Sequence, residues 1–133
     1  SLIIWYCGSA DIAKNRNPND GNNSPEVILR RTKMWIDLTQ KALPDSDILL
    51  VSIIRSPKKK YAGLLHKVDG VNRGLEQFAE SIKKVYYIDV NPSLETIYGD
   101  PLMECYISDG LHMSPEGYRR IASLLKPAME KIW

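Results

Sequence analysis

The sequence of 133 residues contains few of the side chains that build metal or redox sites. Its two cysteines, Cys7 and Cys105, do not form a Cys-x-x-Cys arrangement, so nothing in their spacing favours metal binding or redox chemistry. Its two histidines, His66 and His112, are far apart in the chain. Because a protein metal site usually needs three or four clustered ligands, we expect no metal site.

Long apolar runs and a strong net charge are also missing. No stretch of 18 apolar residues is present, so we expect no membrane-spanning helix. The net charge of +2, from 18 basic and 16 acidic side chains, predicts no strong attraction to nucleic acid or to an anionic membrane. The densest basic run is Lys58-Lys59-Lys60. We interpret it as a solvated loop, with contact to an anionic ligand as the alternative.

The sequence does contain alternating strand and helix patterns. Continuous apolar runs predict buried strands at 2–7, 48–54 and 85–90. Ser-Pro-Glu at 24–26 and again at 114–116 is typical of a helix start, and the composition of 15–23 is that of a loop. This order predicts an α/β fold, with one domain over 1–133 and a parallel sheet covered by helices on both faces.

Apolar residues at helical spacing predict which faces are buried. For the helix after residue 24 we expect a face of Val27, Met34, Trp35, Leu38 and Ala42. For the next helix we expect a face of Val68, Val71, Leu75, Phe78, Ala79 and Ile82. The tryptophans Trp5, Trp35 and Trp133 are expected to pack in the protein.

The first predicted strand, Leu2 to Cys7, carries no charge, no proline and no sign of a bulge. Edge strands usually contain such features, because these discourage unwanted pairing. We therefore expect this strand to be an interior one. Its second neighbour would come from a preceding segment of the same polypeptide or from a partner protein.

The most informative motif is Asp109-Gly110-Leu111-His112, just before the last predicted helix. An Asp three residues before a His can hold one imidazole nitrogen, which leaves the other free to take a proton from a hydroxyl nucleophile. This pair makes up two thirds of a hydrolase triad. The connection 91–108 before it is long, and loops of that length are often functional. Tyr98 and Tyr106 lie in this connection; we expect them to pack, with lining of a substrate pocket as the alternative.

These residues resemble those of the SGNH (GDSL-type) serine esterases and lipases. Asp109 to His112, followed by Ser114 to Tyr118 and an amphipathic helix, is similar to the family's last block, in which the Asp and His are catalytic. The segment Cys7 to Ala13 resembles the block that usually reads Gly-x-Asn-Asp. Residues 42–57 resemble the following strand and its exit. The resemblance runs over nearly the whole chain but corresponds only to the C-terminal part of the family's domain. It implies a three-layer, flavodoxin-like parallel sheet without the first strands.

The chain departs from the family pattern in two ways. Ala10 stands where the family's Asn donates to the oxyanion, and loss of one such donor typically costs about 10²–10³ in turnover. The Gly-Asp-Ser block with the nucleophile is absent from these residues. Ser9 follows a strand and a glycine, as a nucleophile can, but its long separation from His112 fits the Gly-x-Asn-Asp block better. Ser56 is a weaker alternative.

The resemblance implies ester hydrolysis through an acyl-enzyme. His112 would act as base and then acid, Asp109 would orient it, and Gly8, Ser9 and Ala10 would form the oxyanion region. The serine would come from a segment outside this chain, and no metal or organic cofactor is implied. The expected partners are a small-molecule ester and the segment or protein that pairs with Leu2 to Cys7. The alternative is a catalytically inactive relative, a pseudoenzyme with a structural or binding role in a complex. A small phosphate- or nucleotide-binding flavodoxin-like module is a third and weaker interpretation.

Overall fold

The computed structural model describes residues 1–12 and 24–133. The three strands in this part of the chain form one parallel sheet in the order β1-β2-β3. They are β1 (Leu2–Trp5), β2 (Asp47–Val51) and β3 (Val85–Ile88). In the register, Leu2 pairs with Asp47, and Ile48 pairs with Val85. The loop predicted at 15–23 lies outside the described residues.

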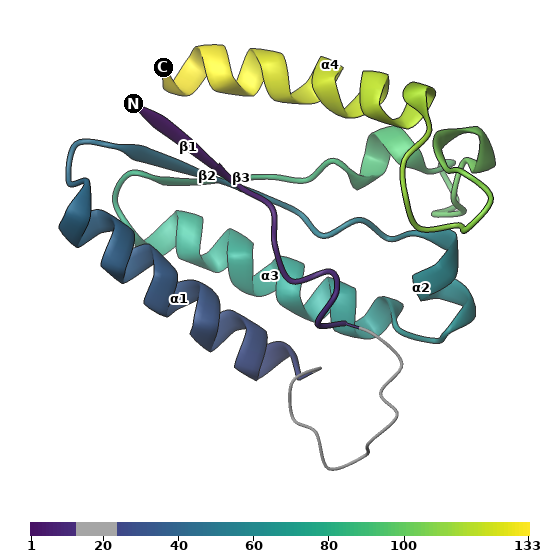
Figure 1. The fold of residues 1–133 in the computed structure, drawn as a ribbon, viewed down its shortest axis with the longest axis horizontal. Helices are drawn as coiled ribbons and strands as arrows, with labels where there is room; N and C mark the ends of the chain where they lie inside the picture. Colours follow the sequence, from purple (N-terminus) through teal and green to yellow (C-terminus); the bar gives the residue numbers. More distant parts are fainter. Residues whose placement is uncertain (13–23) are drawn as a thin grey trace.

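The sheet lies between two helical layers (Figure 1). Two helices cover one face, α1 (Pro25–Ala42) and α3 (Leu65–Ser81), and α4 (Pro115–Ile132) covers the other. This arrangement confirms the predicted α/β fold with a parallel sheet and helices on both faces. Among the described helices, none is both long enough and apolar enough to cross a membrane.

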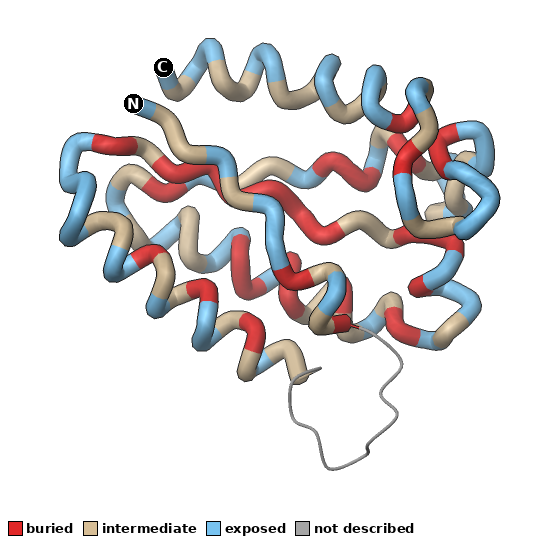
Figure 2. Tube along the Cα trace, viewed as in Figure 1, coloured by how far each residue is buried: buried red, intermediate tan, exposed pale blue. Residues whose placement is uncertain are grey.

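The core has two parts, one on each face of the sheet. Buried residues follow β2 and the inner side of α3 (Figure 2). The part under α1 and α3 includes Ile36, Leu50 and Val71, each fully buried. The part under α4 includes Val90, Leu94 and Cys105. The middle strand β2 is therefore buried on both faces, as its continuous apolar run predicts.

The predicted face of α3 is confirmed, but that of α1 is wrong. In α3, Val68, Val71 and Leu75 are buried as expected. In α1 the buried positions are Ile28, Thr32 and Ile36. Two members of the predicted face, Met34 and Leu38, are 58% and 64% exposed.

The cause of the α1 error is tertiary packing. The buried stripe includes the polar residue Thr32, whose hydroxyl donates to the Ile28 carbonyl at 2.9 Å and so is satisfied inside the protein. Contact between Leu29 and Gly74 of α3 then fixes the rotation of the helix. The Trp5–Trp35 stack, with ring centroids 3.9 Å apart, holds α1 against β1.

Among the described residues, β1 pairs only with β2 and so lies at the edge of the sheet. Its Ile4 side chain is 43% exposed although it is large and apolar. Both observations agree with the expectation that another strand pairs here, which stays a prediction.

The basic run at 58–60 is not a solvated loop. It forms most of a short helix, α2 (Pro57–Tyr61), which begins at the cap residue Ser56. Lys58 and Lys60 are exposed, but Lys59 is only 6% exposed. The predicted solvent exposure is wrong for Lys59, because its side chain points inward and donates to backbone carbonyls. No sequence pattern reveals these partners.

Candidate active site

Asp109 and His112 form a hydrogen-bonded pair at the edge of the sheet where the strands end. Asp109 Oδ2 lies 2.5 Å from His112 Nδ1. The other carboxylate oxygen, Oδ1, accepts the backbone N–H groups of Leu111 and His112, each at 2.9 Å. The i, i+3 spacing closes this turn locally. The geometry needed for a triad carboxylate and base is therefore present without help from distant residues.

The electrostatics of the pair fix its protonation pattern. Hydrogen bonds from the His112 ring, and then from the His112 and Leu111 backbone, hold the pKa of the Asp109 carboxyl well below its usual value. An ionised carboxylate only accepts hydrogen bonds, so Nδ1 must donate to it. In the neutral imidazole Nε2 is then unprotonated. Among the described residues Nε2 has no protein partner, which leaves it able to take a proton from a nucleophile.

Backbone contacts with neighbouring segments hold the loop of the pair. Gly110 has φ +66, a conformation that side chains with a Cβ rarely adopt. Its carbonyl accepts the Lys58 N–H at 2.9 Å, which joins the loop to the start of α2. The His112 carbonyl accepts the Ile107 N–H at 3.0 Å. The loop is therefore anchored on both sides, although His112 itself is 69% exposed at its side chain.

The start of α4 also fixes the position of the loop. The Ser114 side chain accepts the Gly117 N–H at 3.2 Å, as an N-cap does, and its hydroxyl donates to the Glu104 carbonyl at 2.5 Å. The Ser114 N–H donates to the Cys105 carbonyl at 2.9 Å. Gly117 packs directly against that same carbonyl, where a Cβ has no room. The sequence identifies the cap, but only the structure explains the glycine.

The turn after β1 begins at Gly8, which has φ +107. A Cβ there would lie 3.2 Å from Ile28 and 3.3 Å from Ile53, so both the backbone angle and the close packing favour glycine. The Ile12 N–H closes the turn on the Gly8 and Ser9 carbonyls, at 3.3 and 3.2 Å. Residues 8–10 thus form a tight turn shortly after the end of β1, which is where the sequence places them.

The buried Lys59 holds this turn from below. Its ammonium donates to the Ser9 carbonyl at 2.5 Å and also to the Ile12 carbonyl. Burial, and then the charge of Lys58, lowers the pKa of the Lys59 ammonium. Sequence reasoning missed this residue, since a lysine within a basic run gives no sign of burial.

Two cavities flank His112. The first, of about 340 Å³, is lined by Tyr6, Ser9, Ala10, Ile12, Lys58, Lys59, Ala62, Leu64, Leu111 and His112. The second, of about 310 Å³, is almost entirely apolar and lies between the sheet and α4. Tyr6, Leu111 and His112 line both cavities and form the ridge between them. The structure thus brings Ser9 and Ala10 to the same cavity as His112, whereas Gly8 is buried and lines neither of the two cavities.

Two buried asparagines fix the exit of β2 next to this site. Asn72 accepts the Ile53 N–H at 2.7 Å and donates to the Ile53 carbonyl at 3.0 Å. Asn91 donates to the same carbonyl and accepts the Arg55 N–H at 2.8 Å. They replace the hydrogen bonds that the strand ladder no longer supplies, as buried backbone groups require. Sequence reasoning missed both residues.

The alternative interpretation of Tyr98 and Tyr106, that they line a substrate pocket, finds no support in the two cavities beside His112. Tyr98 is 85% exposed, and Tyr106 is buried in the core under α4. Neither side chain lines the first or the second cavity beside His112. The default expectation of packing is therefore confirmed for Tyr106 alone.

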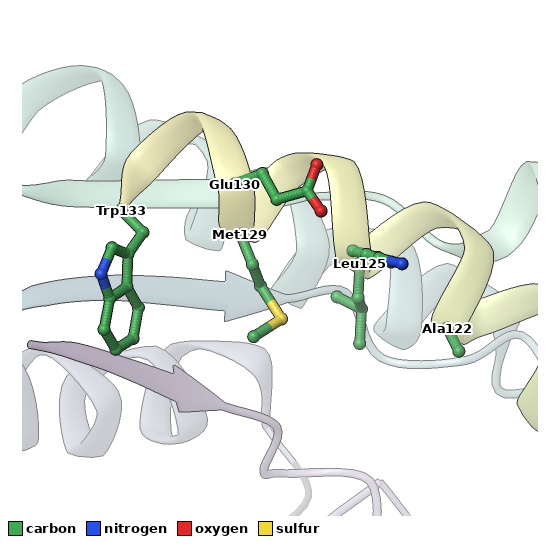
Figure 3. Close-up of a pocket in the computed structure, with 6 residues that line it drawn as sticks. Ala122, Leu125, Met129, Glu130 and Trp133 are labelled. Carbon is green, nitrogen blue, oxygen red and sulfur yellow. The ribbon is translucent and has the colours of Figure 1, made fainter.

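A further apolar groove of about 440 Å³ lies along the C-terminal half of α4. Figure 3 shows Leu125, Met129 and Trp133 pointing from α4 toward the strands. Trp133 is 82% exposed, so the prediction that it packs is wrong. This groove follows the half of α4 that lies away from His112, and it shares Leu125 with the second cavity.

The comparisons with known proteins agree with this geometry at the level of the fold. A scan against protein-family models and a search of curated proteins found no match. Solved structures do match. A GDSL-like lipase from Bacteroides thetaiotaomicron superposes with a TM-score of 0.76 at 20% identity, over 99% of this chain and 63% of its own. The chain has the fold of the GDSL-type esterases.

Two other solved structures superpose on this chain to the same extent. A protein from Streptococcus pneumonia that is named after platelet activating factor has a TM-score of 0.77 at 23% identity, over 99% of this chain and 59% of its own. A carbohydrate esterase family 3 protein from Talaromyces cellulolyticus has a TM-score of 0.76 at 15% identity, over 98% and 57%. The chain therefore spans about three fifths of the length of these structures.

Proposed function

We propose that this chain is the part of a GDSL-type serine hydrolase that carries the general base, and that the complete protein hydrolyses carboxylic esters. The observation that carries the proposal is the Asp109–His112 pair, with Oδ2 and Nδ1 2.5 Å apart. The fold shared with esterases supports it, because the pair lies at the edge where parallel sheets place their chemistry.

In the proposed reaction a serine supplied by a segment outside this chain attacks the ester carbonyl. His112 Nε2 takes the serine proton, and the resulting imidazolium gives a proton to the departing alcohol. Asp109 holds the ring in the correct tautomer and stabilises the imidazolium. In the second half of the reaction, water attacks the acyl-enzyme while His112 Nε2 takes its proton. The imidazolium then returns a proton to the departing serine oxygen. No metal or organic cofactor is needed for these steps.

The serine-carrying segment is proposed to add a strand along the free edge of β1. Support comes from the exposed Ile4 side chain and from the single pairing of β1 among the described residues. A strand there would also bring the segment close to the ridge of Tyr6 and His112. Whether that segment belongs to the same polypeptide or to a partner protein is decided by the mass of the native chain.

The test uses the complete native polypeptide with p-nitrophenyl acetate as substrate and a fluorophosphonate as serine label. We expect hydrolysis and labelling in the parent protein, and loss of both in His112→Gln. The control His66→Gln changes an exposed histidine on α3 and should leave both unchanged. A parent protein that neither hydrolyses the ester nor takes the label contradicts the proposal.

Ala10 favours a second candidate function. An alanine side chain cannot donate to an oxyanion, and a relative that has lost its activity can keep the fold as a binding or structural subunit. In that case the label and the ester would fail, and the native protein would instead be isolated with another chain paired to β1. The two candidates therefore predict opposite results in the same experiment.

A further inference from the structure

The ridge between the two cavities contains a hydroxyl, that of Tyr6, which has no part in the proton transfer proposed for Asp109 and His112. Tyr6 follows β1 and lines both cavities together with His112. The other hydroxyl of the first cavity belongs to Ser9, and Tyr118 adds one at the second. The Lys59 ammonium is nearby, but it is already bonded to two backbone carbonyls.

The surroundings of the Tyr6 hydroxyl suit a neutral hydrogen-bond donor. Tyr6 is 47% exposed as a whole, but the partial burial of its phenol raises the pKa of that group, and contacts with the Ser9 side chain and the Ile54 backbone offset part of that rise. The phenol therefore keeps its proton at neutral pH. The backbone contact with Ile54 lowers the pKa of the phenol, as an N–H donor to the phenol oxygen does, and such a contact leaves the phenolic proton for another acceptor.

Acyl transfer needs such a donor. When a nucleophile bonds to the carbonyl carbon, the π electrons of the C=O bond move to its oxygen, and the oxygen becomes an anion until the leaving group departs. Preorganised donors beside that oxygen are usually the largest single contribution to the rate, and tyrosine hydroxyls are among the groups that serve. Ala10 lines the same cavity and has no donor to offer.

We propose that the Tyr6 hydroxyl donates the side-chain hydrogen bond to the ester oxyanion, with Ser9 positioning the phenol. The inference rests on the proposed function, since it assigns a donor to that same reaction. It makes Tyr6 a catalytic residue and Ser9 a positioning residue. The serine nucleophile still comes from elsewhere, and no covalent bond to Tyr6 or Ser9 forms.

The test compares Tyr6→Phe with Tyr61→Phe in the complete native polypeptide, using p-nitrophenyl acetate. Tyr61 is 83% exposed and is absent from both cavities, so its variant should behave as the parent protein. For Tyr6→Phe we expect kcat to fall about 10²-fold with KM nearly unchanged, because the donor acts on the transition state. Ser9→Ala should lower kcat in the same direction by a smaller factor.

A rescue variant separates a donor from a structural role. In Tyr6→Phe combined with Ala10→Asn, the amide provides a donor on the neighbouring position, and kcat should recover at least about tenfold. A tyrosine that only packs would lose stability in Tyr6→Phe, and Ala10→Asn would restore nothing. Thermal unfolding of each variant shows whether the fold is kept.

The outcomes distinguish this inference from the proposed function. If the parent protein hydrolyses the ester, His112→Gln is inactive and Tyr6→Phe keeps kcat within about twofold, the donor role is wrong and the hydrolase proposal stands. If Tyr6→Phe loses activity and Ala10→Asn brings no recovery, the donor role is also wrong. If the parent protein shows neither hydrolysis nor labelling, both proposals fall together.

Discussion

The packing of Gly117 against Cys105 predicts a large difference between two glycine-to-alanine substitutions in helices. At Gly117 a Cβ would lie 3.0 Å from Met113 Sδ, 3.1 Å from the Cys105 carbonyl carbon and closer still to the carbonyl oxygen. The backbone at Cys105 cannot move aside freely, because its carbonyl also accepts the Ser114 N–H at 2.9 Å. At Gly70 the nearest atoms belong to Pro25 at 3.7 Å, which is ordinary contact.

These contacts set the size of each effect. Replacing glycine by alanine inside a helix stabilises it by about 1 kcal/mol when there is room. Overpacking costs about 1–3 kcal/mol, and a weakened hydrogen bond to Cys105 costs about 0.5–1.5 kcal/mol more. We therefore expect Gly117→Ala to lose about 1–3 kcal/mol of unfolding free energy and Gly70→Ala to gain up to about 1 kcal/mol.

Urea unfolding of the native polypeptide, followed by tryptophan fluorescence, measures both free energies. Gly74→Ala provides an intermediate case, because its Cβ would meet only the flexible end of Leu29. We expect Gly70→Ala to have the highest unfolding free energy of the three variants, Gly74→Ala an intermediate one and Gly117→Ala the lowest. If Gly117→Ala unfolds at the same urea concentration as Gly70→Ala, the close contact between α4 and Cys105 is not as described.

Three further predictions concern single side chains. Under the proposed function, Asp109→Asn should lower kcat for ester hydrolysis by the native polypeptide about 10⁴-fold, because the amide favours the wrong tautomer of His112; steady-state kinetics measure this, and a loss below tenfold would contradict the orienting role. Lys59→Met should cost about 1–3 kcal/mol in urea unfolding, because two backbone carbonyls lose their donor, whereas Lys60→Met removes only an exposed ion pair and should change little. Arginines at 119 and 120 lower the pKa of Glu116 to about 2, so its contribution is present above pH 4.5 and is lost as the pH falls toward 2. The stability difference between the parent protein and Glu116→Gln should shrink over that range, and a difference that stays constant would rule out this assignment.

The features that the sequence predicted correctly are local ones. The three apolar runs and the two Ser-Pro-Glu starts establish the order of strands and helices, because a strand buried on both faces and a capped helix leave patterns within a few residues. The Asp109–His112 bond is equally local. It closes over three residues, so the spacing alone gives the geometry that the structure contains.

The features that the sequence missed all depend on distant partners. The α1 stripe could not be chosen from periodicity, because contact with α3 at Gly74 sets the rotation of that helix. The basic run around Lys59 predicts solvent exposure, but the Lys59 ammonium donates to backbone carbonyls that lie 47 and 50 residues away in the sequence. Asn72 and Asn91 lie in two different elements and both bind the backbone where β2 ends. No pattern in the sequence around either residue predicts this role.

The sequence by itself therefore determined the fold class and the base of the candidate site. Only the tertiary structure decided what surrounds that base: the two cavities, the ridge with Tyr6, and the turn that Lys59 holds beneath Ser9 and Ala10. The physical reason is the range of the interactions. Backbone propensity, capping and an i, i+3 hydrogen bond act within one turn of chain, whereas cavities and buried charges arise where segments far apart in sequence come into contact.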